Sequence, residues 1–260
     1  MVRHIDQTDK EVRLVTRTDD ATTREQYVRG VKTEVAIARV RAEVAALSTE
    51  LVQAGLAGWG GGDLSVRVPG ADLFVIKPPA GDHDDLAPEN AIVCDLDGDA
   101  LTGTPGSERL PGADVAVHSR LYRDRPAVRG IVRSQSPYVL AHVAAGEGIP
   151  CLVAAMAERF GSGIPIVTPP LDDSAAVADA VVEALSSGPA PAVLVAGDGA
   201  YVTGDSAREA VASAGLVEEM ARVALLVRTT GAAASLPHET VDRLHAAFRE
   251  RTTKTTDDRR

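Results

Sequence analysis

Apolar residues recur every three or four positions over residues 25–56, with charged residues between them. This spacing is typical of an amphipathic helix that buries one face. The residues on that face are Val28, Val31, Val35, Ala36, Ala38, Val40, Val44, Leu47, Leu51 and Val52. A run of glycines follows and predicts the end of the helix and a turn: Gly55, Gly58, Gly60, Gly61 and Gly62.

Beyond this turn the apolar runs become short, which is typical of strands. The pattern predicts strands over residues 64–68, 73–76, 92–94, 128–132, 164–167 and 192–196. It predicts helices over residues 115–122, 137–145, 174–185, 206–228 and 240–248. Strands mixed with helices indicate a single layered α/β (α+β) domain over residues 25–248. Polar residues 1–24 predict a flexible N-terminal arm, and residues 249–260 a charged C-terminal tail.

Composition narrows the class of protein. The chain has 260 residues, of which 45% are hydrophobic and 25% charged, so a disordered or collagen-like chain is excluded. We expect no membrane-spanning helix, because no apolar run approaches about 18 residues. The polar N-terminus does not resemble a secretory signal. A net charge of −10 argues against non-specific binding to nucleic acid.

Cysteine and histidine positions bear on the chemistry. Two cysteines, Cys94 and Cys151, are too few for a disulfide scaffold and favour a reducing, cytoplasmic compartment. Neither has a neighbouring His or Lys, so we expect both to be buried and inert. None of the six histidines lies within five positions of another, so every short-range zinc motif is absent.

Five segments, in this order, resemble the class II aldolase/adducin family. They are Gly-Asp-Leu-Ser at residues 62–65, Ile-Lys-Pro-Pro-Ala at 76–80, Leu-Pro-Gly-Ala-Asp at 110–114, residues 118–135, and residues 193–204 with Ala207, Glu209 and Ala210 after them. The resemblance covers about residues 30–230. It implies a class II aldolase-like fold, a central and mostly antiparallel β-sheet flanked by helices. It also implies sugar-phosphate aldolase or epimerase chemistry and a homo-oligomer, in several members a cyclic tetramer.

Members of that family hold a divalent metal, usually zinc, with three histidines. The resemblance places Arg133, Gln135 and Asp198 at those three positions. A guanidinium is a permanent cation and cannot ligate a metal, and an amide beside one carboxylate makes a poor zinc site. We therefore expect that the zinc site is lost and that the protein needs no cofactor. A less favoured alternative is a Mg²⁺ or Mn²⁺ site at Asp198, Asp114 and Gln135.

The positions that bind phosphate in the family also differ. Asp63, Pro79 and the pair Gly112-Ala113 stand where the family carries Asn, Ser and Ser-Ser. Asp63 would repel a phosphate dianion, and Pro79 and Ala113 offer no side-chain donor. The expected substrate is therefore a small carbonyl or carboxylate compound rather than a sugar phosphate.

Two residues that match positions of the family site are retained, one just before the predicted helix at 115–122 and one on it. Asp114 stands where the family has its acid/base carboxylate, so it is either a proton shuttle or a helix N-terminal carboxylate. His118 follows one turn later on the same helix face. It is either a core histidine or a residue that supports the substrate site.

Arg133 carries the main functional hypothesis. Its guanidinium either binds and polarises a substrate or forms an inert ion pair with Asp198 or Asp114 in the vacated pocket. In the first case the protein is a metal-independent enzyme of lyase, isomerase or condensation chemistry. Asp114 would then move the proton, and Gln135, Asp198, Tyr138 and Asp63 would line the pocket. In the second case it is a catalytically inactive scaffold or binding protein, as adducin's head domain is within the family.

Two further motifs have weaker signals. The glycines at 60–62, beside Trp59, are interpreted as a flexible connector, because no Lys-Ser/Thr follows them. The run Asp82-His83-Asp84-Asp85 lacks EF-hand spacing and is interpreted as a solvated acidic loop.

Overall fold

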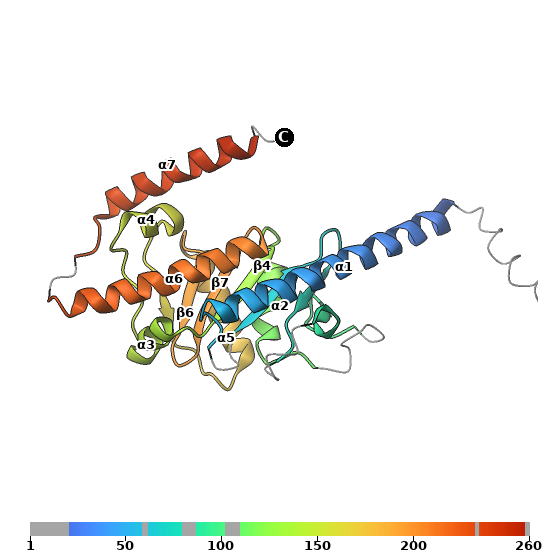
Figure 1. Ribbon diagram of the computed structural model, residues 1–260, viewed down its shortest axis with the longest axis horizontal. Helices are drawn as coiled ribbons and strands as arrows, with labels where there is room; N and C mark the ends of the chain where they lie inside the picture. Colours follow the sequence, from blue (N-terminus) through green and yellow to red (C-terminus); the bar gives the residue numbers. More distant parts are fainter. Residues whose placement is uncertain (1–20, 59–61, 80–86, 102–109, 232–233, 258–260) are drawn as a thin grey trace, which may run out of the picture.

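The computed structural model describes residues 21–58, 62–79, 87–101, 110–231 and 234–257. Figure 1 shows a sheet with helices on both faces. The elements are α1 (Ala21–Gln53), β1 (Asp63–Arg67), β2 (Leu73–Ile76), η4 (Pro88–Asn90), β3 (Ile92–Asp95), α2 (Val115–Asp124), β4 (Gly130–Ser134), α3 (Pro137–Ala145), α4 (Ala154–Phe160), β5 (Ile166–Val167), α5 (Ser174–Ser186), β6 (Ala192–Val195), β7 (Gly199–Gly204), α6 (Ala207–Arg228) and α7 (His238–Asp257).

The described strands form one seven-stranded sheet with the order β3-β2-β1-β4-β7-β6-β5. Every neighbouring pair is antiparallel except β5 and β6, which are parallel. The predicted central, mostly antiparallel sheet flanked by helices is confirmed. β4 and β7 lie at its centre, and the candidate residues Arg133 and Asp198 are on or beside these two strands.

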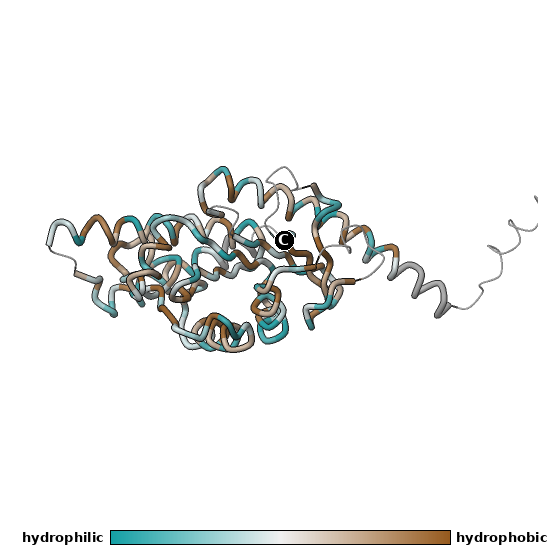
Figure 2. The backbone as a smooth tube through the Cα atoms, turned by 90° about the horizontal axis from the view of Figure 1, so that it is seen from below, coloured by the Kyte–Doolittle hydropathy of each residue, from teal (hydrophilic) through white to brown (hydrophobic). Residues whose placement is uncertain are grey.

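Alternating strand residues belong to two hydrophobic layers, one on each face of the sheet, because successive side chains of a strand point to opposite faces. Val132, Leu194 and Val202 pack under α1, α3, α4 and α6. Ile131, Val193 and Tyr201 face the other way and pack against α2 and α5. Figure 2 shows the apolar stretches of the chain concentrated in the body between these layers. The parity places Arg133, two residues after Ile131, on the face covered by α2.

Two glycines let helix α6 begin directly on the sheet. Gly130 and Gly204 are register partners on β4 and β7. A Cβ atom on Gly130 would lie 2.5 Å from Cα of Ala207, and one on Gly204 would lie 2.5 Å from the backbone nitrogen of Ala210. Only glycine fits such an approach. The N-terminus of α6 is therefore fixed at one end of the central strands, and Arg133 lies towards the other end.

The predicted elements agree with the observed ones at most places. The helix predicted over 137–145 is α3, with the same bounds, and the strand predicted over 192–196 is β6 to within one residue. The strand predicted over 128–132 lies two residues later, as β4, because pairing with β7 continues through the polar Arg133 and Ser134. The pattern does not predict β7, because glycines stand at both of its ends. It does not predict α4 either, because this helix has only seven residues.

The two ends of the domain differ from the prediction. Helix α1 begins at Ala21, and its N-terminal half projects beyond the sheet (Figure 1). Helix α7 continues to Asp257, so the expected charged tail is helical over most of its length. Arg251 on this extension contacts Glu158 on α4 at 3.2 Å, which fixes it to the body.

Other sequence expectations have plain outcomes. Cys94 and Cys151 are free and buried, and burial raises the pKa of both thiols, for Cys94 to about 12. Within the described residues, no helix is both long and apolar enough to cross a membrane. Trp59, the glycines at 60 and 61 and the motif at 82–85 lie outside the described residues.

Candidate functional site

Three neighbouring strands place polar side chains in one row across the centre of the sheet. Asp63 on β1 is the register partner of Arg133 on β4, and Arg133 is the register partner of Tyr201 on β7. Register partners point to the same face of a sheet, with Cβ atoms about 5 Å apart. Helix α2 covers this face and brings Asp114, its N-cap residue, to the end of the row.

Arg133 lies at the centre of three carboxylates. Its guanidinium forms a two-point ion pair with Asp198, in which Nε donates to Oδ2 at 3.2 Å and Nη2 donates to Oδ1. Its Nη1 lies 3.3 Å from Oδ2 of Asp114 and 3.7 Å from Oδ2 of Asp63. The exposed fraction of the Arg133 side chain is 14%. We refer to Arg133, Asp63, Asp114 and Asp198 as the arginine cluster.

The cluster keeps its arginine charged. Burial alone would lower the pKa of Arg133, but the hydrogen bonds to Asp198 and the charges of Asp114 and Asp198 raise it instead. A buried guanidinium without such partners would carry a large desolvation cost. Asp198 and Asp114 supply these partners, so the structure contains both of the ion pairs that the sequence analysis offered as alternatives.

Asp63 and Asp114 are neighbouring carboxyl groups whose pKa values shift in opposite directions. Burial, followed by the hydrogen bond to Asp114 and its charge, raises the pKa of Asp63 to about 7. Burial also acts to raise the pKa of Asp114, but the hydrogen bond from Asp63 and the charge of Arg133 outweigh it and hold that pKa below its ordinary value. Two carboxylates in contact cannot both ionise freely, so one is protonated near neutral pH. The protonated one is Asp63, which is the more buried.

Tyr201 contacts Asp114 directly, and His118 packs against Tyr201. The Tyr201 hydroxyl donates to Oδ1 of Asp114 at 3.0 Å. The His118 ring lies edge-on to the Tyr201 ring, with 6.3 Å between centroids. Burial raises the pKa of Tyr201 and, with the nearby Asp114 and Asp198, keeps its hydroxyl protonated as a donor.

His118 is completely buried, as the core interpretation predicted. Its Nδ1 lies 2.6 Å from Oγ of Ser65, which also lies 2.9 Å from the hydroxyl of Tyr122. Burial lowers the pKa of His118 to about 4, so the ring is neutral at pH 7. With no exposed surface, His118 is placed to support the helix carrying Asp114 rather than to contact a substrate.

Gln135 joins the cluster through its amide nitrogen. Nε2 donates to the backbone oxygen of Asp198 at 3.1 Å and to its Oδ1 at 3.4 Å. Its backbone N–H donates to Leu56 O at 3.3 Å. Gln135 thus holds Asp198 in position next to Arg133.

Lys77 is a site residue that the sequence analysis did not single out. Its Nζ lies 3.9 Å from Oδ1 of Asp63 and donates to the backbone oxygen of Pro78 at 3.0 Å. Its position in the motif at 76–80 is the signal that could have identified it. With Lys77 and Arg133 cationic, Asp198 anionic and one negative charge on the Asp63–Asp114 pair, the formal charges of the site balance.

Tyr138 is not brought to the cluster. Its side chain is 36% exposed, and its ring lies under the guanidinium of Arg222, 5.9 Å away. Its backbone N–H and that of Val139 donate to Glu218 on α6, at 3.0 and 2.9 Å. Glu218 also accepts from Ser136 Oγ at 2.6 Å, so it caps the N-terminus of α3.

The donor set does not fit a zinc ion. Arg133 lies between Asp114 and Asp198, where a cation already bridges the carboxylates, and Gln135 turns its amide nitrogen, a donor, towards Asp198. Zinc needs three or four N, S or O ligands around one point. Among the described residues, no three His, Cys, Asp or Glu side chains are grouped so that they could hold a metal ion.

Three solved structures have a similar fold. An L-fuculose 1-phosphate aldolase superposes with a TM-score of 0.73 at 23% identity, over 81% of this chain and 96% of that one. YgbL from Klebsiella pneumoniae gives 0.68 at 25% identity, over 79% and 97%. The L-fuculose-1-phosphate aldolase from Thermus thermophilus gives 0.62 at 25% identity, over 76% and 100%.

The sequence comparison agrees with the structural one. The model of the class II aldolase and adducin N-terminal domain matches residues 42–225, which include every residue of the arginine cluster. This match spans well over half of the chain, and the element order and sheet agree with it. The chain therefore belongs to the class II aldolase and adducin N-terminal domain family.

Proposed function

We propose that this protein is a metal-independent acid–base enzyme that removes a proton next to the carbonyl of a small compound. The observation that carries the proposal is the placement of Asp63 and Asp114 at 3.7 and 3.3 Å from Nη1 of Arg133, where burial raises the pKa of Asp63 and the charge of Arg133 helps to lower that of Asp114. A protonated and an ionised carboxyl group, held together next to a fixed positive charge, are the components of enolisation.

The proposed step uses the cluster as follows. Asp114, ionised and 23% exposed, is the base that takes the proton from the carbon beside the carbonyl. The electron pair of the broken C–H bond forms the C=C bond of an enolate, and the carbonyl oxygen becomes negative. Arg133 stabilises that oxygen electrostatically, and the proton on Asp63 can be donated to it. For a hydroxyketone, the enediol then loses the proton of its neighbouring hydroxyl and takes up the proton held by the carboxyl pair at that neighbouring carbon, which completes an isomerisation. Attack of the enolate carbon on a second carbonyl, whose oxygen takes up the proton, gives condensation. The reverse of that step is the lyase reaction, in which the base removes the β-hydroxyl proton and the electron pair of the broken Cα–Cβ bond forms the enolate.

The charge of the site bears on the substrate. The formal charges of Lys77, Arg133, Asp198 and the Asp63–Asp114 pair cancel, so a phosphate dianion finds no net positive charge. The ionised Asp114 and Asp198 would repel it further. We therefore propose a small carbonyl or carboxylate compound rather than a sugar phosphate.

The experiment is hydrogen–deuterium exchange at carbon, followed by proton NMR in D₂O. The protein is dialysed against a chelator and mixed with a panel of two- to four-carbon ketones, hydroxyketones and 2-keto acids. We expect exchange beside the carbonyl of at least one member without added metal. Asp114→Asn and Arg133→Met should each lower the exchange rate at least about a hundredfold.

The matched control is Asp179→Asn, which removes an exposed carboxylate that pairs with Arg120 far from the cluster. It should leave the exchange rate unchanged. Exchange that appears only after zinc, manganese or magnesium is added would contradict metal independence. Exchange unaffected by Asp114→Asn would contradict the assigned base.

A second candidate function is a scaffold or binding protein without catalysis. The observation that favours it is that three carboxylates already engage the guanidinium of Arg133. No exchange on any member of the panel, in a correctly folded protein, would favour this alternative. The homo-oligomer that the resemblance implies stays a prediction, which light scattering of the purified protein tests.

A further inference from the structure

A cavity lies at the opposite end of the central strands from the arginine cluster. Its volume is about 460 Å³, within the range of small-molecule sites. Thr203 and Gly204 at the end of β7 form part of its lining, whereas Asp198 and Arg133 lie near the start of β7 and the end of β4. Helix α7 closes the cavity from outside through His245, Phe248 and Arg249.

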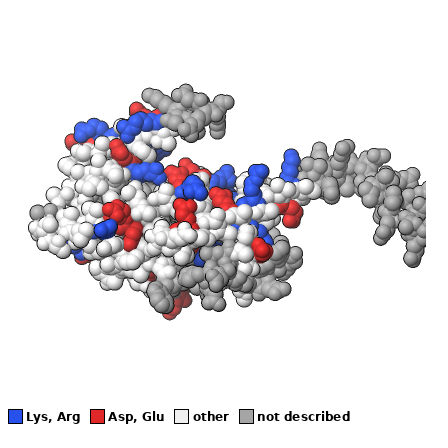
Figure 3. Space-filling model, in the orientation of Figure 1, with Lys and Arg blue, Asp and Glu red and all other residues white. Residues whose placement is uncertain are grey.

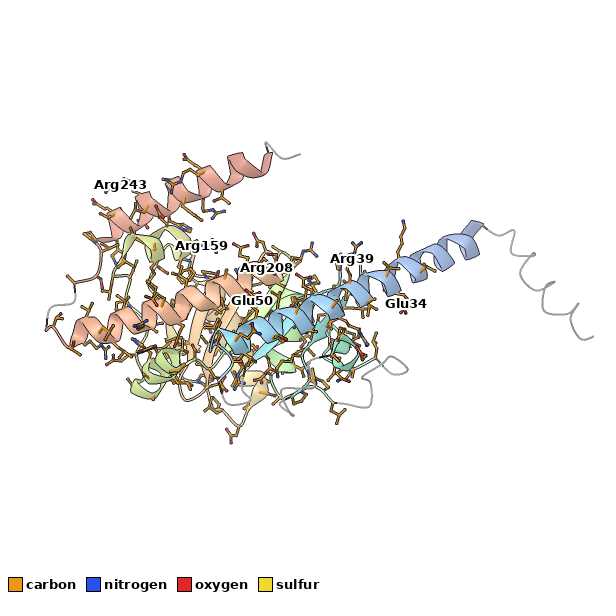
Figure 4. All side chains as sticks on the ribbon, viewed as in Figure 1. Glu34, Arg39, Glu50, Arg159, Arg208 and Arg243 are labelled. Carbon is orange, nitrogen blue, oxygen red and sulfur yellow. The ribbon has the colours of Figure 1, made fainter. Side chains whose placement is uncertain are left out.

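Cationic groups gather at this cavity in a protein whose net charge is −10. Arg125, Arg159 and Arg249 line it, from the segment before β4, from α4 and from α7. Figure 3 shows basic and acidic side chains next to each other between the α4–α7 pair and the rest of the body, and Figure 4 shows Arg159 between α4 and α6. The N-terminus of the 22-residue α6 also borders the cavity, and its partial positive charge adds to theirs.

The acidic side chain of Glu209, which also lines the cavity, neutralises these cations only in part. Glu209 accepts a hydrogen bond from the backbone N–H of Asp205 at 3.3 Å, and its own N–H donates to Ser206 Oγ at 3.1 Å. Glu209 is thus part of the cap of α6. Its distance from Arg159 Nη2 is 4.0 Å, at the limit of an ion pair.

Arg159 keeps donors available. Its hydrogen bond to Ser213 Oγ is 3.5 Å long, and that bond and the contact to Glu209 both use Nη2. Its Nε and Nη1 have no hydrogen bond to the described residues. The exposed fraction of the side chain is 35%, so these two donors can reach solvent or a ligand. Arg125 donates from Nη1 to Leu185 O at 2.9 Å. Arg159 and Arg125 line the same cavity, and each has guanidinium nitrogens without a hydrogen-bond partner among the described residues that can donate to an oxyanion.

The remaining lining supplies an apolar surface. The guanidinium of Arg159 lies over the ring of Phe248, 5.8 Å from its centroid. Pro189, Pro191 and Val128 line the same cavity. His245 is fixed by Nδ1, which donates to Glu158 O at 2.9 Å, so its other ring nitrogen is the one left for a ligand. Such a lining suits a ligand with both a charged and an apolar part.

We propose that this cavity binds a small organic oxyanion, held by the guanidiniums of Arg159 and Arg125 and covered by the Phe248 ring. The charged group is a carboxylate or a phosphate, which share the planar, multidentate recognition by arginine. The site is separate from the arginine cluster, so a ligand there is an effector or a stabilising metabolite rather than the substrate.

Isothermal titration calorimetry of the full chain at constant ionic strength tests this proposal, with citrate and inorganic phosphate as probes and chloride as the blank. We expect saturable binding with a Kd below about 10 mM for at least one probe. Citrate alone indicates a carboxylate ligand, and phosphate alone indicates a phosphate ester. Absence of saturation with both probes would overturn the proposal.

Variants assign the binding to this cavity. Arg159→Gln and Arg125→Gln should each raise the Kd about tenfold, as expected for the loss of a charged hydrogen bond. Arg208→Gln is the matched control, because Arg208 is on α6 nearby (Figure 4) but pairs with Glu50 and does not line the cavity. Thermal unfolding without ligand checks that each variant is folded. Binding that both cavity variants leave unchanged, or that Arg208→Gln weakens equally, would overturn the proposal.

Discussion

Asp63 and Arg133 are register partners on β1 and β4, and 3.7 Å separates Oδ2 of Asp63 from Nη1 of Arg133. The pairing is cross-strand, so the backbone of the sheet rather than a flexible loop holds the cation and this carboxylate together. Asp114 and Asp198 come from the helix and the turn on either side. The guanidinium therefore occupies a rigid site whose charge balance depends on one proton.

Removal of the cation should destabilise the fold. Arg133→Met leaves Asp63, Asp114 and Asp198 close together without a counter-charge, and we expect a loss of about 3–5 kcal/mol in the free energy of unfolding at pH 8. The loss should shrink towards pH 5, because the carboxylates can then take up protons. Urea unfolding at the two pH values measures both effects.

A surface arginine offers the comparison for that experiment. Arg120 is 39% exposed and pairs with Asp124 and Asp179 at 2.6 Å each. Exposed ion pairs contribute little, so Arg120→Met should lower the free energy of unfolding far less than Arg133→Met does. Equal losses for the two variants would contradict the account of Arg133 as a buried, required counter-charge.

Protonation of Asp63 should make the stability depend on pH. The folded protein raises the pKa of Asp63 from 3.8 to about 7, so it binds a proton that the unfolded chain releases. The stabilisation is complete below the unfolded pKa and is lost as pH rises from about 4 to about 7. Its size is on the order of 2–4 kcal/mol.

Asp63→Asn tests this dependence. Its neutral amide can donate to Asp114 as the protonated carboxyl does, but it does not titrate. The variant should match the wild type near pH 4 and be the more stable of the two at pH 8. Chemical unfolding across this range is the measurement, and a variant less stable than the wild type at pH 8 would count against the shared proton.

The hydroxyl of Tyr201 should set the basicity of Asp114. Tyr201→Phe removes a donor to its Oδ1, so the pKa of Asp114 should rise. Carbon-13 NMR of labelled aspartate gives the value. Tyr122→Phe is the control, since that hydroxyl bonds Ser65 instead. If Tyr201→Phe leaves the pKa of Asp114 unchanged, Tyr201 has no positioning role.

The Glu218 carboxylate should stabilise the start of α3. It accepts from two backbone N–H groups of that helix and from Ser136 Oγ, next to Gln135. Glu218→Ala should lower the free energy of unfolding by about 1–2 kcal/mol. Glu219→Ala, one position away and paired only weakly with Arg222, should have a much smaller effect. Thermal unfolding distinguishes the two variants.

Local patterns predict the elements of this fold because each apolar period reflects the side that packs on the sheet. Residues 137–145 show this well: their spacing alone predicts α3. The pattern is less informative where polar residues continue a strand. Because Arg133 and Ser134 are polar, the apolar run ends before them and the predicted strand stops there. They nevertheless belong to β4, because β1 and β7 pair with it on both sides.

The chemistry of the site is predictable only in part, for a similar reason. The resemblance places Arg133, Asp114 and Asp198 in one pocket, and the structure brings them into contact. Proton sharing between Asp63 and Asp114 depends on distances among three separate segments, which no local spacing records. Tyr138 is predicted to line the pocket because it follows Gln135 closely along the chain. Its side chain instead turns towards Arg222 on α6, so closeness in sequence predicts a contact that the structure does not have.

The central claim is that Asp63 and Asp114 hold one proton between them at neutral pH. Carbon-13 NMR titration of the aspartate carboxyl groups, in the wild type and in Asp63→Asn, measures this directly. The account predicts one carboxyl that titrates near pH 7 in the wild type and is absent from the variant. A wild-type protein in which every aspartate carboxyl titrates below about pH 5 would contradict it.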